Sequence, residues 1–151
     1  MSDAQLREEV LGFFASRFGV AEAELADLVL LERRGDIWAV SSLPSPGIVS
    51  RRPPGLRILR RAPHGLKPTT AFLIHLGRRI TTARVDLATD TLEAVLLGRR
   101  IESPQSEGFV ALCYCGDVIG CGRVNHGLLQ TMIPTGRRRE LLTALSETSN
   151  G

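Results

Sequence analysis

The pattern of apolar and polar positions predicts a helix near the start of the chain, from Ser2 to Phe18. Its apolar positions return every three or four residues, the spacing that gathers side chains on one helix face. Ser2 and Gln5 form a candidate capping box, and Gly19 supplies the end of the helix. A second, short helical stretch is predicted from Ala21 to Ala26.

Two apolar runs follow, Leu28–Leu31 and Ile37–Val40, and they flank Arg33-Arg34-Gly35-Asp36. This arrangement predicts a β-hairpin. The next segment, Ser41 to Pro54, holds four prolines and several serines, which predicts an irregular connection. A further strand is expected from Leu56 to Arg61.

Lys67-Pro68-Thr69-Thr70 then precedes a short apolar helix, Ala71 to Leu76. Pro68 suits the first turn of this helix and Gly77 suits its end. We place a domain junction here. The second half opens with a predicted strand from Ile80 to Leu87.

A capped helix is predicted after that strand. Asp90 and Glu93 have the spacing of a helix cap, and Gly98 ends the helix. Its apolar face is formed by residues about one turn apart: Leu92, Val95 and Leu96.

The remaining strands form a predicted meander. Phe109–Cys115 and Val118–Val124 are joined by Gly116-Asp117, which we interpret as a two-residue hairpin turn. Leu128 to Ile133 adds a third strand, and Arg137 to Leu145 predicts a terminal helix. A strand, a helix and then several short strands is the order of a small pseudo-barrel.

The predicted fold class is therefore α+β. Residues 1–77 are expected to form an N-terminal α/β domain, and residues 78–146 a mixed β pseudo-barrel. Residues 147–151 are expected to be a frayed tail.

Four short segments of the second half occur in a recognisable order: Val85-Asp86-Leu87, Thr91–Arg99, Gly108–Leu112 and Ile119–Gly122. In this order they resemble a PUA domain. The resemblance implies RNA binding through the loop after the capped helix, around Gly98, and through the neighbouring last strands.

Three upstream segments extend the resemblance: Phe18-Gly19-Val20, Ile37-Trp38 and Lys67–Thr70. They are similar to the region ahead of the PUA domain in two groups of proteins. One group is the small ribosome-biogenesis factors with an N-terminal α/β domain, and the other is the C-terminal extensions of Sun-family RNA cytosine-5 methyltransferases. The sequence departs from the latter, since it has neither a glycine-rich cofactor motif nor a Pro-Cys nucleophile motif. Cytosine methylation by this chain is not expected.

Charge is distributed unevenly. The net charge is +3, but residues 1–50 carry −4, residues 51–100 carry +8 and residues 101–151 carry −1. A concentrated positive segment indicates a polyanion as partner, with nucleic acid first among the candidates. The candidate RNA-binding residues are Lys67, Arg78, Arg79, Gly98, Arg99, Arg100, Arg123, Arg137 and Arg138.

Cysteines give a C-x-C-x5-C-x4-H series with His126, which resembles a zinc motif. With Gly116-Asp117 as the turn, however, Cys121 would point away from the face of Cys113 and Cys115. We therefore expect reduced, buried thiols and no metal.

The same predicted register groups small residues on one face of the hairpin. Gly120 and Gly122 would lie on the face of Ala111 and Cys113, forming a shallow trough. A packed helix or an RNA backbone could fill it, and packing is the commoner cause. Arg123 would lie on the opposite face.

The sequence has no strand with the pair of aromatic residues on which single-stranded bases stack. Recognition of structured RNA through shape and phosphates is expected instead. The histidines are scattered, and no nucleophile stands in a recognisable motif, so neither an enzyme nor a cofactor is expected.

The predicted function is that of a non-catalytic protein that binds structured RNA (rRNA or tRNA) in ribosome biogenesis, rRNA processing or RNA modification. Ribosome-assembly factors or an RNA methyltransferase are the candidate protein partners. One alternative is a stand-alone specificity subunit or protein-interaction partner of an RNA methyltransferase, and another is a small metal or redox protein. An odd number of cysteines, no export signal and only short apolar runs favour the cytoplasm and no membrane.

Overall fold

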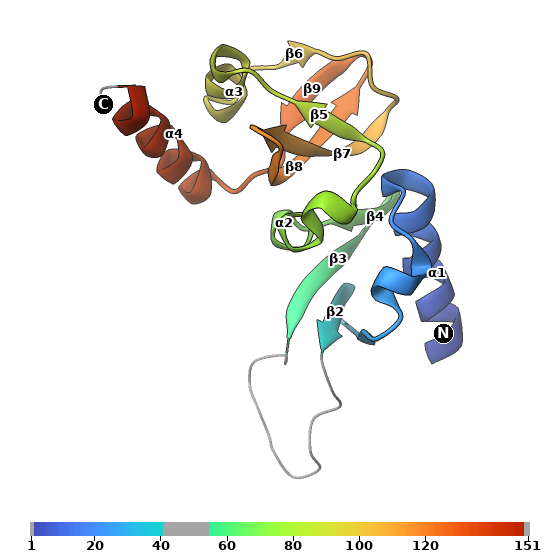
Figure 1. The fold of residues 1–151 in the computed structure, drawn as a ribbon. Helices are drawn as coiled ribbons and strands as arrows, with labels where there is room; N and C mark the ends of the chain where they lie inside the picture. The colour runs from blue at the N-terminus through green and yellow to red at the C-terminus, as the bar shows by residue number, and fades with distance from the viewer. Residues whose placement is uncertain (1, 41–54, 150–151) are drawn as a thin grey trace.

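The protein is α+β and is built on two sheets, one in each half of the chain (Figure 1). The structure is a computed structural model that describes residues 2–40 and 55–149. The predicted irregular connection, Ser41 to Pro54, lies outside these residues. The first sheet has four antiparallel strands in the order β1-β2-β3-β4, and the second has five in the order β5-β7-β8-β9-β6.

The first helix is confirmed as α1, Asp3–Phe18. The Ser2 hydroxyl accepts a hydrogen bond from the backbone N–H of Gln5 at 3.2 Å, and Ser2 N–H donates to Gln5 Oε1 at 3.0 Å. Gly19 ends the helix in the left-handed conformation, with φ of 62°. The second helical stretch is a 3-10 turn, η1, Glu22–Leu25.

The predicted hairpin is also confirmed, as β1, Val29–Arg33, and β2, Asp36–Val40. Its turn residues, Arg34 and Gly35, have φ of 51° and 82°, as the turns that match strand twist require. β3, Leu56–Ala62, completes the strands that were predicted for this half.

A fourth strand, β4, Gly65–Pro68, was not predicted. Pro68 was assigned to the first turn of the following helix, and this was wrong, because Pro68 pairs with Leu59 of β3. The helix is α2, Thr70–Leu76, and its cap is the Thr69 hydroxyl, which accepts from the backbone N–H of Phe72 at 3.1 Å. A 3-10 turn, η2, Gly77–Arg79, follows.

The second half is a curled five-strand mixed half-barrel (Figure 1). Its first strand pairs in parallel with β7, and the other pairings are antiparallel. The elements are β5, Arg84–Asp86; α3, Thr89–Leu96; β6, Ile101–Glu102; β7, Gly108–Tyr114; β8, Asp117–Asn125; β9, Leu128–Thr131; and α4, Thr135–Ser149.

Two helix boundaries differ from the prediction. The N-cap of α3 is Ala88, not Asp90, and the Ala88 N–H donates to Thr91 Oγ1 at 3.0 Å. A threonine hydroxyl thus replaces the predicted carboxylate at the start of this helix. The terminal helix α4 runs to Ser149, beyond the predicted end at Leu145.

The turn between β7 and β8 was predicted one residue too late. Tyr114 pairs with Asp117, so the two turn residues are Cys115 and Gly116, with φ of 51° and 85°. The turn needs positive φ at both positions, and Cys115 adopts it although only Gly116 does so without steric cost. A register shift follows, in which Leu112 pairs with Gly120 but Cys113 pairs with Val118.

This register overturns the argument about the cysteine faces. Cys121 pairs with Ala111, so Cys113 and Cys121 lie on the same face and belong to the same core cluster. The glycines lie on the opposite face from the one predicted. The predicted trough with Ala111 and Cys113 is therefore wrong. A Cβ on Gly120 would lie 2.4 Å from Ile133 Cγ1, so the Ile133 side chain fills the space over Gly120 on the other face.

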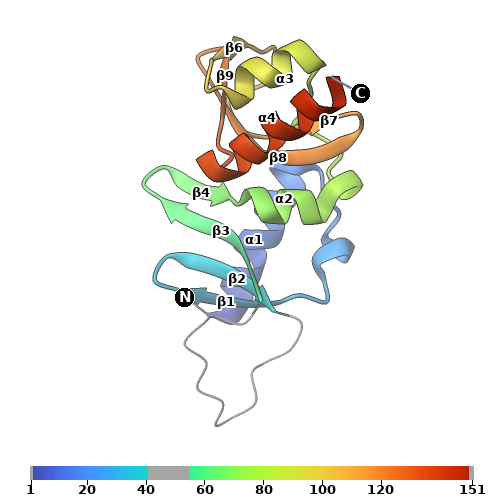
Figure 2. The ribbon, with the colours of Figure 1, turned by 90° about the vertical axis from the view of Figure 1, so that its left-hand side faces the viewer.

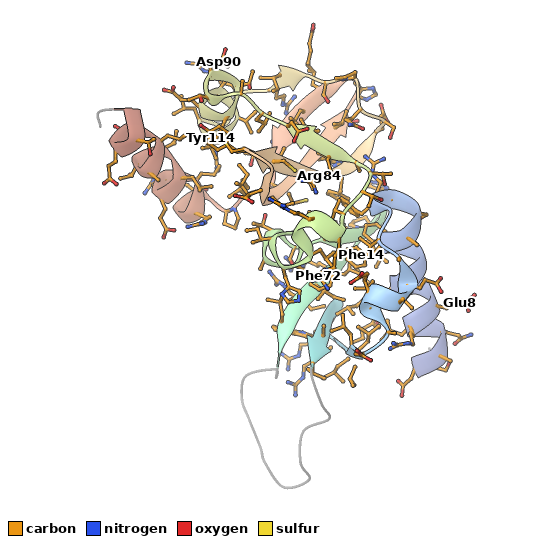
Figure 3. All side chains as sticks on the ribbon, viewed as in Figure 1. Glu8, Phe14, Phe72, Arg84, Asp90 and Tyr114 are labelled. Carbon is orange, nitrogen blue, oxygen red and sulfur yellow. The ribbon has the colours of Figure 1, made fainter. Side chains whose placement is uncertain are left out.

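The first core joins the two halves. Phe14 of α1 and Phe72 of α2 meet with ring centroids 5.1 Å apart (Figure 3). α2 lies between the first sheet and the half-barrel (Figure 2), and Thr70 Oγ1 accepts a hydrogen bond from the Cys121 N–H at 3.1 Å. The core cluster accordingly includes Ala111 and Cys121 of the half-barrel.

The second core lies within the half-barrel. Leu92 and Val95 of α3 pack with buried residues of the sheet, and Leu141 and Leu145 of α4 pack against them. The apolar face predicted for α3 is therefore confirmed. The division into domains after residue 77 stays a prediction.

Candidate nucleic-acid interface

A groove crosses the molecule from the first sheet to the half-barrel. It consists of three adjoining hollows with volumes of about 440, 590 and 140 Å³. Lys67 and Met132 line both the first and the second hollow, while Arg123 and Met132 line both the second and the third. We call this continuous surface the basic groove.

The lining of the basic groove is cationic. Within the described part of the chain, no aspartate or glutamate lines any of the three hollows. The absence of carboxylates matters because a groove lined by one sign of charge concentrates ions of the other sign. The lining cations are Arg17, Arg57, Arg60, Lys67, Arg100, Arg123 and Arg137.

Some of these cations have acidic neighbours outside the groove. Arg57 and Arg60 both approach Asp36, each at 3.8 Å, and Arg137 pairs with Glu140 at 2.8 Å. These arginine side chains remain 45%, 66% and 51% exposed, respectively. Ion pairs of such exposure contribute little free energy, so these arginines can exchange partners readily.

Arg17 has a structural part in the groove. Its Nε donates to the Phe109 carbonyl at 2.6 Å, and its two Nη atoms donate to the hydroxyl and carbonyl oxygens of Ser106 at 2.8 and 3.0 Å. Partial burial lowers the pKa of Arg17, yet a guanidinium stays protonated at neutral pH. Arg17 thus holds α1 against the start of β7 and keeps a positive charge at the middle hollow.

The middle hollow has an apolar wall. It is lined by four apolar side chains that are only partly buried: Phe13 of α1, Leu66 of β4, Phe109 of β7 and Met132. The Arg123 guanidinium carbon lies 5.9 Å from the centroid of the Phe109 ring, within the range of a cation–π contact. This hollow therefore combines accessible rings with cations.

The Gly98 loop lies at the end of α3. Gly98 has φ of 91°, and its N–H donates to the Val95 carbonyl at 2.9 Å. Arg138 supports this helix end, since its Nε and Nη1 donate to the carbonyls of Ile133 at 3.1 Å and Leu96 at 3.4 Å. The guanidinium of Arg138 is thereby engaged in joining α3 to α4.

Arg99 and Arg100 follow the Gly98 loop and differ in their setting. Both are exposed, and neither side chain makes an ion pair within residues 2–40 or 55–149. Arg100 lines the third hollow, so the loop borders the basic groove through this residue.

Arg78 and Arg79 lie in η2, apart from the lining of the groove. Arg79 donates to the carbonyls of His75 at 2.9 Å and Leu76 at 3.2 Å, and it lies 3.7 Å from Glu24. Its guanidinium closes the end of α2, whereas Arg78 is exposed.

Two further arginines of the positive segment also hold the fold together. Arg84 Nη1 donates to the carbonyl of Ile80 at 3.0 Å, and its Nη2 donates to that of Gly116 at 3.2 Å. Arg61 pairs with Glu32 of β1 and with Glu9 of α1, at 2.7 Å for the latter. The charge of +8 between residues 51 and 100 is therefore only partly available to a ligand.

The structure brings together four of the predicted site residues, Lys67, Arg100, Arg123 and Arg137, in one groove. The other predicted residues line no part of it: Arg78, Arg79, Gly98, Arg99 and Arg138.

Sequence reasoning did not select Arg17, Arg57 or Arg60 as site residues. Arg57 and Arg60 belong to the positive segment, and that segment was the available signal for them. Arg17 carried no such signal, because its contact with Phe109 joins residues 92 positions apart.

The half-barrel that forms one side of the groove is a PUA domain. Residues 82–139 match the family described as the Methyltransferase RsmF PUA domain, and they form a PUA domain of this RsmF methyltransferase type. PUA domains are typical of RNA binding in RNA-modifying proteins. A search of curated proteins found no match to the chain.

The three cysteines are free thiols, Cys113 and Cys121 buried and Cys115 exposed. Burial raises the pKa of Cys113, and it raises that of Cys121 to about 12, so both are protonated at neutral pH. In the part of the chain that the structure describes, no three His, Cys, Asp or Glu side chains gather as metal ligands. None of the helices in this part has the length and apolar character needed to cross a membrane.

Proposed function

We propose that this protein is a non-catalytic binder of structured RNA, rRNA or tRNA, in ribosome biogenesis or RNA modification. The observation that supports it is the basic groove, which has cations from both halves of the chain and no lining carboxylate among the described residues. The groove lies along the PUA domain, a domain typical of RNA binding.

Phosphates would occupy the groove at several points. Arginine presents a planar fork of donors that matches a phosphate, and Lys67 adds a compact charge where the first two hollows adjoin. Because contacts to the backbone carry no sequence information, the groove recognises the shape of the RNA. Recognition of shape suits a structured RNA. Ribosome-assembly factors or an RNA methyltransferase are the proposed protein partners.

A non-catalytic role suits the chemistry of the lining. His64 and His126 are the histidines of the groove, and they line different hollows. No carboxylate lines the groove beside His64 to form an acid–base pair with it, within the described chain. His126 Nδ1 lies 3.9 Å from Glu107 Oε1, but the His126 side chain is 87% exposed. The free thiols fit a reducing compartment, so we assign the protein to the cytoplasm.

RNA titrations over a range of salt concentrations test the proposal. If the groove neutralises about four phosphates, log affinity should fall with log salt at a slope of roughly −3 to −4. Arg123→Ala should weaken binding about 5- to 20-fold and make the slope less steep by about one. Arg33→Ala is the matched control, since Arg33 is exposed, has no ion-pair partner within the described residues and lines none of the hollows.

The Gly98 loop is tested in the same titrations. Arg99→Ala should cost roughly 1 to 3 kcal/mol of binding if this loop contacts the RNA as in the PUA resemblance. Stability should hardly change, because the Arg99 side chain is exposed. A flat salt response would contradict RNA binding, and equal affinities of the Arg99→Ala and Arg33→Ala variants would remove the loop from the site.

A second candidate function is that of a specificity subunit that carries RNA to a separate methyltransferase. The match of residues 82–139 to a domain of the RsmF methyltransferase type favours it. Co-purification of a methyltransferase with the tagged protein after ribonuclease treatment would support this role. Loss of the methyltransferase after the same treatment would show that RNA bridges the two proteins, and only the RNA-binding function would remain.

A further inference from the structure

We infer that the middle hollow of the basic groove receives one unpaired nucleotide of a structured RNA. We call this hollow the Phe109 pocket, lined by Phe13, Leu66, Phe109 and Met132 together with Arg17, Lys67 and Arg123. This inference rests on the proposed function and specifies which feature of the RNA the protein selects.

The wall of the Phe109 pocket suits a nucleobase. Phe13 and Phe109 come from α1 and β7, and both rings remain partly accessible in a solvent-lined hollow. An aromatic ring that is left accessible beside cations gains free energy when a flat base covers it, because every base has a π-face. Leu66 and Met132 supply further apolar contact, and a methionine adapts to the shape of its partner.

The cations suit the sugar-phosphate backbone on either side of that base. Lys67 and Arg123 also line the neighbouring hollows, so they lie where the RNA backbone would enter and leave the pocket. Neither makes an ion pair within residues 2–40 or 55–149. The Arg123 guanidinium carbon lies over the Phe109 ring, 5.9 Å from its centroid, which keeps a cation near the stacking surface.

Size and charge restrict the occupant. The pocket has a volume of about 590 Å³, which lies within the range of roughly 300–1,000 Å³ of pockets that bind small molecules. A base that is paired within a duplex cannot enter such a pocket, whereas a bulged or loop nucleotide is already unstacked and enters at little cost. The charge favours an acidic ligand, since three cations and no carboxylate of the described chain line the pocket.

The experiment compares two RNA hairpins with the same stem, one fully paired and one with a single bulged adenosine. The wild-type protein should bind the bulged hairpin about 5- to 100-fold more tightly, the range expected for stacking of one base. With 2-aminopurine at the bulge, bound protein should protect its fluorescence from quenching by acrylamide.

Two variants assign the preference to the pocket. Phe109→Leu keeps an apolar side chain but removes the ring, so the preference for the bulge should fall to about 3-fold or less while the salt slope stays the same. Ala62→Leu narrows the pocket from an exposed position on its lining, so it should also reduce the preference without affecting folding. Thermal unfolding of each variant is the control.

The outcomes separate the two proposals. Equal, salt-dependent binding of both hairpins by the wild type overturns the nucleotide pocket and leaves the RNA-binding groove in place. Absence of salt-dependent binding to either hairpin overturns both. A bulge preference that Phe109→Leu and Ala62→Leu retain in full overturns the assignment to this pocket.

Discussion

Replacement of Gly120 by alanine tests the register of the β7–β8 hairpin. A Cβ on this residue would lie 2.4 Å from Ile133 Cγ1 and 2.6 Å from Ile133 Cδ1. Contacts below 3.0 Å require a shift of one partner. Ile133 is 3% exposed and packs in the core of the half-barrel, so it has little space to move.

The expected magnitudes follow from this packing. Gly120→Ala overfills the core and should lower the free energy of unfolding by about 1 to 3 kcal/mol. Ile133→Ala removes a buried side chain and should lower it by about 2 to 5 kcal/mol. In the double variant the new methyl group occupies part of the space that Ile133 leaves. The stability loss of the double variant should therefore be smaller than the sum of the two single losses by about 1 to 2 kcal/mol.

Urea unfolding of the wild type and the three variants provides the free energies for this double-mutant cycle. The alternative register, with Gly116-Asp117 as the turn, would place Gly120 on the face of Ala111 and Cys113, whose core cluster does not contain Ile133. Additive losses, or a stability of Gly120→Ala equal to that of the wild type, would refute the register on which the cysteine and glycine assignments depend.

Three further predictions concern thiols, pH and a helix junction. Ellman's reagent should modify one cysteine, Cys115, rapidly in the native protein and all three after unfolding; three fast thiols would contradict the buried positions of the others. Glu9→Gln should reduce stability at pH 7 by about 0.5 to 1 kcal/mol. The hydrogen bond from Arg61 lowers the pKa of Glu9. The contribution of the Glu9 carboxylate to stability is therefore present above the usual pKa of a carboxyl group and is lost as pH falls through the lowered pKa. A difference in stability between the wild type and Glu9→Gln that persists at about pH 2 would disprove this. Arg138→Ala should lower the melting temperature, because the carbonyls of Leu96 and Ile133 lose their donor, and an unchanged melting temperature would show that this junction is dispensable.

Local signals in the sequence were sufficient where one residue decides the geometry. The Ser2 capping box, the Gly19 stop and the Gly98 stop each appear at the predicted residue. In these cases the Ser2 side chain hydrogen-bonds to the backbone within one helical turn, and the glycines, which have no side chain, adopt a positive φ without steric strain. Such features do not depend on the rest of the fold.

Tertiary context decided the features that sequence reasoning missed. β4 is short and contains Pro68, which reads as a turn or helix start until β3 pairs with it. The hairpin turn was misplaced because Gly116-Asp117 has the preferred turn composition, whereas the fold places Cys115 in the left-handed conformation. That shift reversed the relation between Cys113 and Cys121.

The candidate site was predictable as a charge distribution but not as a list of residues. Arginines that bind the fold together look identical in sequence to those that line the groove. Arg84 and Arg138 donate to backbone carbonyls, while Arg123 and Arg100 line hollows of the groove. Contacts between distant segments decide which arginine is which.

The first hydrophobic core spans the chain from Leu6 to Cys121 and thereby makes the groove a product of cooperative folding. A fragment that begins after residue 77 would uncover the face of Ala111 and Cys121 and would lack Lys67. Ligand affinity is then linked to the folding free energy of the N-terminal half, because any RNA that spans the groove binds only the joined state. Substitutions at Phe14 or Phe72, which do not line the groove, would shift RNA affinity by mass action in proportion to the population of that state.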